Sequence, residues 1–297
     1  MTSFFTLAIV QSALEVGFIY ALVAMALFLS YSVLNIADLS TDNCFILGCA
    51  VGSTVALAGH PFLGLFAAMA AGVCSGFVTA FLQTRLGVES ILAGIIVNTG
   101  LYTINLMAMG FTSNLNLFKC TTIFTLARDV LEPVIGSWYK LAVAVFITLL
   151  AALALRLFLT TRLGLSIRAT GDNPDMVRAS SINTAFTVTV GLCVSNALTA
   201  LSGAVLAQYQ KTADINLGTG MVIIGLASLI IGETLTRKGS VGKKVFGALI
   251  GSILYRFIIA IALRLDLPSE CLKLISAVIV ALAIGIPALR AEKKGAV

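Results

Sequence analysis

Long apolar runs recur along the whole sequence, and they limit the possible folds more than any other feature. Nine runs approach or exceed the ~20 residues that a helix needs to cross a bilayer, at 6–30, 39–59, 62–84, 88–110, 138–160, 184–207, 219–236, 245–264 and 271–288. Only 11% of the residues are Asp, Glu, Lys or Arg, against roughly 25% in a soluble domain. So few charges cannot cover a water-facing surface. We therefore expect an all-α polytopic membrane protein with about nine (8–10) transmembrane helices, forming a single domain over residues 1–297.

The second run, at 39–59, could either span the membrane or re-enter on the same side. Polar residues from Asp38 to Asn43 open it, and only Cys44 to Ala58 is continuously apolar. That core is shorter than the ~20 residues of a full span. If residues 44–58 cross the membrane, the N-terminus lies outside the cell; if they re-enter on the same side, it lies inside.

Lys and Arg residues gather at the ends of alternate runs. Twelve of the nineteen follow the third, fifth, seventh and ninth runs: Arg85, Arg156, Arg162, Arg168, Arg178, Arg237, Lys238, Lys243, Lys244, Arg290, Lys293 and Lys294. Because cytoplasmic ends carry the excess of basic residues, we expect a cytoplasmic C-terminus in the plasma or inner membrane. The mixed segment 111–137 then forms an extracytoplasmic loop that carries a short surface helix.

The sequence offers no catalytic or metal-binding motif. The nearest glycine–lysine cluster, Gly239 to Lys244, lacks the spacing of a phosphate-binding loop. His60 is the single histidine, and the six cysteines have neither CxxC spacing nor a histidine partner. The basic residues punctuate apolar runs and do not form a nucleic-acid-binding patch. We therefore expect a transport protein that is not an enzyme, has no cofactor or metal of its own and binds no nucleic acid.

A short helix is predicted within the cytoplasmic segment 163–183. Asn173 can cap it, Pro174 suits its first position, and Asp175 suits the positive end of its dipole. A helix over 174–180 is too short to be stable alone, so it needs something to dock against, as a coupling helix does. The alternative is an amphipathic helix lying on lipid headgroups. The candidate coupling residues are Gly171, Asp172, Asn173, Pro174, Asp175, Met176, Val177, Arg178 and Ala179.

Several longer motifs resemble a known family. They are IADLSTDN at 36–43, LGCAV at 47–51, LAGIIVN at 92–98, LTALSGAVLAQYQ at 198–210, IGLASLIIGE at 224–233 and SILYR at 252–256. The sequence resembles the permease subunits of ABC importers of the branched-chain amino acid and ribose type. Within that family it is most similar to the branch associated with tryptophan and tyrosine. It departs from the family at Asn43 and Ser181, where relatives tend to have glycine.

The resemblance implies a type II-like ABC importer permease that acts as a homodimer. Its implied partners are two cytoplasmic ATPase subunits, which bind ATP and magnesium, and an extracytoplasmic solute-binding protein. The implied solute is an amino acid, with an aromatic one favoured by the branch. The competing hypothesis from the residues is an ion-coupled secondary transporter that needs no ATPase, and a third is a membrane scaffold without transport.

Polar residues inside or beside apolar runs are the candidates for the solute pathway, because such groups are costly in lipid. Asn98, Asn105 and Asn196 line the pathway or form interhelical hydrogen bonds. Asp38, Asp42 and Glu233 are the candidates for a gate at the inner mouth. Capping of helices explains the two aspartates equally, and ion pairing with Arg237 or Lys238 explains Glu233.

Two further features carry weaker predictions. Arg256, within a run, is expected to snorkel or to pair with an acidic group. Glycine pairs such as Gly72 with Gly76 and Gly247 with Gly251 predict close helix packing. The Gly-interrupted segments 92–98 and 224–232 hint at paired interrupted helices, which are typical of transporters.

Overall fold

The computed structural model describes residues 7–236 and 240–264, together with four positions between 274 and 281. Those residues are almost entirely helical, as the apolar runs predict. The helices are α1 (Leu7–Leu27), α2 (Thr41–Leu57), α3 (Pro61–Thr84), α4 (Ser90–Ala108), α5 (Ile123–Ile135), α6 (Tyr139–Thr160), α7 (Arg162–Asp172), α8 (Pro174–Ala179), α9 (Thr184–Gln210), α10 (Met221–Leu235) and α11 (Val241–Arg264). A π-helical turn, η1 (Phe28–Val33), extends α1, and a 3₁₀ turn, η2 (Gly136–Trp138), precedes α6.

Six helical stretches of the described chain are long and apolar enough to cross a membrane, whereas α2 and α10 are apolar but shorter. Each predicted run from 6–30 to 245–264 coincides with a helix. The ninth, 271–288, lies outside the described residues except for four positions. The all-helical polytopic architecture is confirmed, and the total of nine spans stays a prediction.

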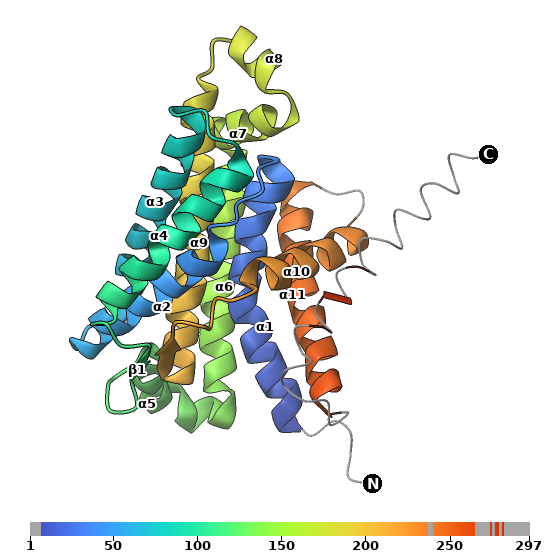
Figure 1. Cartoon of the computed structure of the whole chain (residues 1–297). Coiled ribbons are helices and arrows are strands. Elements are labelled where there is room, and N and C mark those ends of the chain that lie inside the picture. Colours follow the sequence, from blue (N-terminus) through green and yellow to red (C-terminus); the bar gives the residue numbers. More distant parts are fainter. Residues whose placement is uncertain (1–6, 237–239, 265–273, 275–276, 279–280, 282–297) are drawn as a thin grey trace.

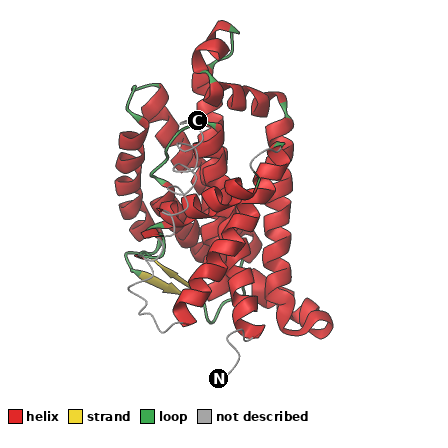
Figure 2. Cartoon of the chain, turned by 90° about the vertical axis from the view of Figure 1, so that its right-hand side faces the viewer, coloured by secondary structure: helices red, strands yellow, loops and turns green. Residues whose placement is uncertain are grey.

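The long helices run roughly parallel to one another, and the segments that connect them lie at the two ends of the bundle (Figure 1). Helices α7 and α8 project from one end, which we call the α8 end. At the other end lie α5 and a two-stranded antiparallel sheet of β1 (Asn114–Asn116) and β2 (Thr212–Asp214), visible in Figure 2; we call it the strand end. Segment 111–137 thus contains β1 and the short helix α5, while its extracytoplasmic location stays a prediction.

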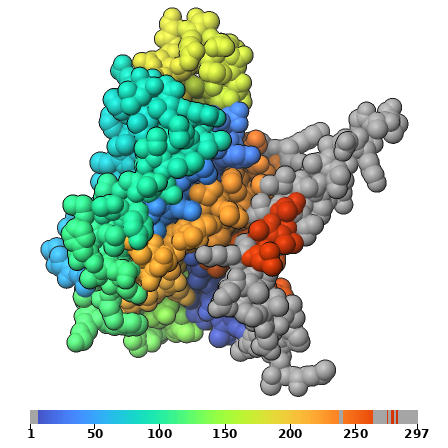
Figure 3. All heavy atoms as spheres, in the orientation of Figure 1, coloured from blue at the N-terminus to red at the C-terminus, as the bar shows by residue number. Residues whose placement is uncertain are grey.

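Helices α1 and α9 form the centre of the bundle. Within their most apolar windows, 78% of α1 with η1 and 83% of α9 are buried, against 28% for α4. The outer helices expose large apolar side chains such as Phe66, Phe77 and Phe146. In the space-filling view, α4 and the chain that follows it cover one side of the molecule (Figure 3). These outer faces have the composition expected of surfaces in contact with lipid.

Glycines form tight seams between particular helices. An ideal Cβ at Gly72 of α3 would lie 2.4 Å from the carbonyl oxygen of Asn196 in α9, and one at Gly203 of α9 would lie 2.0 Å from that of Phe45 in α2. A Cβ at Gly251 of α11 would lie 2.0 Å from the carbonyl oxygen of Ser228 in α10. The predicted close packing at Gly72, Gly76, Gly247 and Gly251 is therefore confirmed.

The short helices α2 and α10 both begin in the middle of the bundle. The first turn of α2 contacts Asn98, at the centre of α4, and the first amides of α10 contact Asp42 of α2. From there α2 runs obliquely towards the strand end, whereas α10 lies across the bundle (Figure 1), and Glu233 near its end contacts Ser32 of η1. Segments 34–40 and 215–220 lead into the two helices. Neither 92–98 nor 224–232 is itself interrupted, because they lie within continuous α4 and continuous α10. We refer to α2 and α10, which begin in the middle of the bundle, as the interrupted helices.

Candidate functional site

The candidate site is the polar layer at which α2 and α10 begin. Asp38 precedes α2 and is 3% exposed. One of its carboxylate oxygens accepts hydrogen bonds from the backbone N–H and the hydroxyl of Ser40, at 2.9 and 2.6 Å. The other accepts one from the side-chain amide of Asn196 in α9, at 2.8 Å. A residue predicted for the gate and one predicted for the pathway therefore belong to one buried network.

Asp42, in the first turn of α2, holds the start of α10. Its carboxylate accepts hydrogen bonds from the backbone N–H groups of Gly220 and Val222, at 3.1 and 2.9 Å. An anion at this position satisfies amides that have no partner within their own helix and favours the positive end of the helix dipole. The segment before α10 can approach α2 this closely only with glycine at position 218, since a Cβ at Gly218 would lie 2.2 Å from the Asp42 carbonyl oxygen. The capping interpretation of Asp42 thus has a geometric basis, with α10 as the capped helix.

The two asparagines of α4 meet a third, Asn43 of α2. The Asn43 backbone N–H donates to the Asn98 side-chain oxygen at 3.0 Å, and the Asn43 side chain donates to the Asn98 carbonyl oxygen at 2.8 Å. Asn105 donates to the Asn43 carbonyl oxygen at 3.0 Å. This geometry favours the interhelical interpretation of Asn98 and Asn105. The buried Oδ1 atom of Asn105 has no hydrogen-bond partner among the described residues.

Glu233 lies apart from the two aspartates. Its carboxylate accepts a hydrogen bond from the hydroxyl of Ser32 in η1. Glu233 lies eleven residues beyond Val222, which corresponds to roughly 16 Å along a helix. The three acidic residues of the predicted gate therefore form no single cluster. The predicted pairing of Glu233 with Arg237 or Lys238 involves residues outside the described part of the chain.

The coupling segment folds as its sequence predicts. The Asn173 side chain accepts hydrogen bonds from the N–H groups of Asp175 and Met176 at 3.1 and 3.0 Å, and α8 begins at Pro174. Asp175 and Arg178 form an exposed ion pair at 3.4 Å. Val177, 1% exposed, anchors the helix, whereas Met176 is 58% exposed. The short helix thus presents an apolar side chain and a charged pair at the α8 end.

The nine candidate coupling residues do not share one environment. Seven are exposed at the α8 end, and Val177 is buried. Gly171 is only half-buried, and a Cβ there would lie 1.8 Å from the carbonyl oxygen of Val33. Gly171 therefore joins α7 to the end of α1.

The departure from the family at Ser181 has a conformational meaning. Ser181 follows α8 and adopts φ +61°, a left-handed conformation that glycine adopts with little strain and other residues adopt at a cost. A glycine would adopt this backbone with less strain than Ser181 does. The helix ends at Ala179, within one residue of the predicted end.

Arg256 of α11 contacts an aromatic ring. Its guanidinium carbon lies 4.0 Å from the centre of the Tyr20 ring in α1, a cation–π arrangement. Neither ion pair recorded among the described residues involves Arg256, so its snorkelling or pairing with an acidic group stays a prediction.

Sequence reasoning missed two polar residues that join helices at the strand end. Glu15, 3% exposed, accepts hydrogen bonds from the Tyr209 hydroxyl at 2.6 Å and from Gln11 at 2.8 Å. Gln208 links α9 to the start of α3 and the start of α5. The signal for Glu15 was available, because an ionisable residue inside a membrane run marks a position of interest.

The described residues contain no group of three or more His, Cys, Asp and Glu side chains placed to hold a metal ion. The site is instead a set of amide, hydroxyl and carboxylate groups that connect α2, α4, α9 and α10. Such an arrangement can bind or pass a polar solute only if these hydrogen bonds rearrange.

Comparison with known proteins identifies the family. A family model described as the permease component of branched-chain amino acid transport systems matches residues 9–284. The tyrosine transport system permease protein of Clostridioides difficile is 32% identical over 270 residues, covering 91% of this chain and 88% of that protein. The ribose import permease protein RbsC of Escherichia coli K12 is 25% identical over 299 residues, covering 95% and 86%. No solved structure matches. The chain therefore belongs to the permease components of branched-chain amino acid transport systems, and it is a multi-pass membrane permease.

Proposed function

We propose that the chain is the transmembrane subunit of an ABC importer that admits an amino acid, in particular an aromatic one, by alternating access. The single observation that carries this proposal, beyond the family, is the exposed helix α8. It is capped by its own Asn173, anchored by Val177 and otherwise open to a partner. The printed name of the tyrosine transport relative supports the class of solute.

The proposed assembly contains two copies of this permease, two ATPase subunits and a solute-binding protein. The ATPases, which would bind ATP and magnesium, dock at the α8 end, and this end and the C-terminus face the cytoplasm. The binding protein docks at the strand end, near segment 111–137 and β2. This orientation rests on the excess of basic residues after alternate runs.

The contacts of α7 suggest how movement of the ATPases would reach the polar layer. Gly171 of α7 packs on Val33, and Ser32 beside it donates to Glu233 of α10. The other end of α10 is held by Asp42. In this proposal, displacement of α7 and α8 shifts η1 and α10, and the buried hydrogen bonds of Asp38, Asn196 and Asn105 open a path for the solute. ATP binding would shift the population between outward-open and inward-open states.

A comparison of two exposed ion pairs at opposite ends tests the coupling role. Met176→Glu, Asp175→Ala and Arg178→Ala variants alter α8, and the Arg128→Ala/Glu132→Ala variant removes the ion pair of α5 at the strand end. With unchanged size-exclusion profiles, the α8 variants are expected to copurify several-fold less ATPase and to lose solute-stimulated hydrolysis. The α5 variant, which lies on the face proposed for the binding protein, is expected to retain ATPase copurification, and that is the readout compared between the two ends. Wild-type copurification and hydrolysis in the α8 variants would exclude the coupling role.

The competing proposal, an ion-coupled secondary transporter, is motivated by the buried carboxylate of Asp38 and the half-buried one of Asp42, where the interrupted helices meet. All four carboxylate oxygens of Asp38 and Asp42 accept hydrogen bonds from described residues, and those bonds would have to break before an ion could bind. Reconstitution of the purified chain alone separates the two proposals. Solute uptake driven by a proton or sodium gradient without ATPase would overturn the importer proposal.

A further inference from the structure

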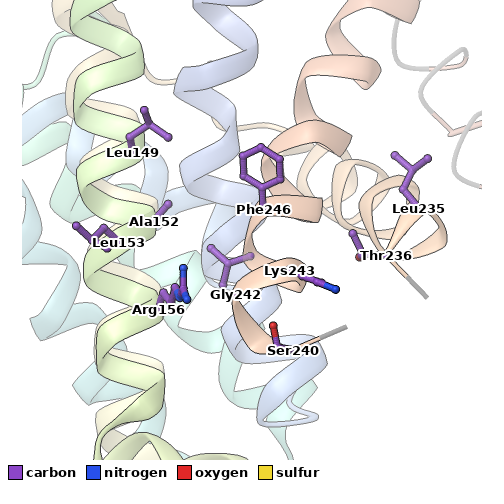
Figure 4. A pocket seen from close by; sticks show the side chains of 11 residues that line it. Leu149, Ala152, Leu153, Arg156, Leu235, Thr236, Ser240, Gly242, Lys243 and Phe246 are labelled. Atoms are coloured by element: carbon purple, nitrogen blue, oxygen red, sulfur yellow. The ribbon is translucent and has the colours of Figure 1, made fainter. Parts of the chain in front are cut away.

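A large cavity opens on the flank of the bundle, between α6 and the junction of α10 with α11. Its volume is about 1010 Å³. It is lined by Leu149, Ala152, Leu153, Arg156, Leu235, Thr236, Ser240, Gly242, Lys243, Val245 and Phe246 (Figure 4). It lies towards the α8 end, because Arg156 is four residues from the end of α6 and Lys243 is in the first turn of α11. It is separate from the polar layer at which α2 and α10 begin.

The polar groups of this cavity are cationic or neutral. Arg156 of α6 and Lys243 of α11 both line it, together with Ser240 and Thr236, and none of the eleven lining residues is acidic. Both ion pairs recorded among the described residues involve other side chains. A cavity lined by two cations and by no carboxylate favours the binding of an anion.

A glycine fixes the position of one cation. A Cβ at Gly242 would lie 3.0 Å from Nε and 3.3 Å from Cζ of Arg156. The guanidinium of α6 therefore lies against bare backbone at the start of α11. This contact brings Arg156 of α6 against the first turn of α11, which also carries Lys243.

The remaining wall of the cavity is apolar, and its side chains follow one another along the length of α6 and α11. Leu149, Leu153 and Arg156 share one face of α6, since they are four and three residues apart. On α11, Phe246 likewise follows Lys243 towards the middle of the bundle. Figure 4 shows Leu149 and Phe246 at one end of the cavity and Arg156 and Ser240 at the other. Leu149, Leu153 and Phe246 are 48%, 53% and 55% exposed, so each has free surface for a ligand.

We propose that this cavity binds one anionic phospholipid from the leaflet at the α8 end. The phosphate lies between Arg156 and Lys243 within reach of the Ser240 hydroxyl, and an acyl chain lies along Leu149, Leu153 and Phe246. The basic residues lie at the depth expected for lipid headgroups, and the apolar wall lies nearer the bilayer centre. This arrangement fits a phospholipid better than a soluble anion. The bound lipid bridges α6 to the start of α11 where the two helices leave a gap.

Native mass spectrometry of the full-length protein with phosphatidylglycerol or phosphatidylcholine tests this site. The wild type is expected to retain phosphatidylglycerol in preference to phosphatidylcholine. The Arg156→Gln/Lys243→Gln variant is expected to lose the preference, with about a fivefold drop in affinity for each removed cation. Arg162→Gln/Lys244→Gln is the matched control, because it removes one basic residue from the same end of the bundle and one beside Lys243, neither of which lines the cavity.

A second pair of variants tests the apolar wall without altering charge. Leu153→Trp fills the cavity and is expected to displace the lipid, whereas Leu157→Trp, at an exposed position of α6 outside the cavity, is expected to leave it bound. The proposal is overturned if wild type retains the two lipids equally, if both charge variants lose phosphatidylglycerol equally, or if Leu153→Trp retains it. Competition by soluble glycerol phosphate as effective as that by the lipid would show a free-anion site and would also overturn the proposal.

Discussion

The two interrupted helices begin side by side, yet they are held in different ways. The start of α2 is tied to two long helices, through Asp38 to Asn196 of α9 and through Asn43 to Asn98 of α4. The start of α10 has no side-chain cap of its own and depends on the Asp42 carboxylate. The comparison indicates that α2 is part of the scaffold, whereas α10 is a helix that can be released by the loss of one carboxylate. We expect substitutions at the α2 start to lower the stability of the whole protein. We expect substitutions at the α10 start to have a smaller effect, confined to α10.

The largest loss of stability is expected at the α2 start. Asp38→Ala removes a buried carboxylate that is the nearest acceptor of the Ser40 hydroxyl and of the Asn196 amide, and it leaves them with longer contacts of 3.5 and 3.2 Å. Unsatisfied buried groups and lost bonds to a charge together cost about 3 kcal/mol. Thermal unfolding in detergent should show a clearly lowered midpoint. Asp129→Ala on exposed α5 is the control, and equal midpoints for the two variants would contradict a scaffold role for Asp38.

Asp42→Ala should release the α10 start at a smaller cost, about 1 kcal/mol, as expected for loss of a helix cap. Hydrogen exchange should accelerate at the amides of Gly220 and Val222 and remain slow in α2. Asp214→Ala, which removes a comparable carboxylate–amide bond to Asn216 in the same connection, should leave the α10 amides protected. Equal acceleration in α2 and α10 would show that the two starts are one unit and would remove the distinction.

Asn43→Ala should cost about 0.6 kcal/mol, the typical value of an interhelical hydrogen bond in a membrane protein. The side-chain bond to the Asn98 carbonyl oxygen and the long bond from Asn105 at 3.5 Å are lost, while the Asn43 backbone N–H still has its acceptor. The unfolding midpoint should fall slightly, and uptake by the assembled importer should persist. A fall as large as that of Asp38→Ala would show that α4, and not α9, is the main anchor of α2.

Glu233→Gln should have the smallest effect, below about 0.5 kcal/mol. The glutamine side-chain oxygen can still accept the hydrogen bond from Ser32. The unfolding midpoint should match that of Glu132→Gln, the control on exposed α5. A marked drop specific to Glu233→Gln would show that the negative charge holds the end of α10, as the ion-pairing interpretation requires.

The sequence predicted the features that depend on local pattern. Eight apolar runs coincide with helices, and Asn173 and Pro174 define the start of α8 as predicted. Capping and apolar length act within a few residues, so they can be read without a partner helix. The family and its permease function also followed from motifs spread over most of the chain.

The features that depend on tertiary contact could not be predicted in this way. Nothing local to Asp42 indicates that its carboxylate reaches the amides of Gly220 and Val222, far along the chain. The interrupted helices were sought at 92–98 because glycine there suggested a break, whereas Gly94 is a contact point with Leu39 inside a continuous helix. Glycine in a membrane helix marks close packing as well as breaks, and only the neighbouring helix distinguishes the two.

The glycine seams have a mechanical consequence. Backbones that touch at Gly72 or Gly203, and again at Gly232 or Gly251, cannot slide past each other without a clash at every turn. We expect α2, α3 and α9 to move as one rigid block and α10 with α11 as another. Helix α1 packs against both blocks, so one block would rotate against the other about α1. The hydrogen bonds of Asp42 to the start of α10 would hold the two blocks together until they break.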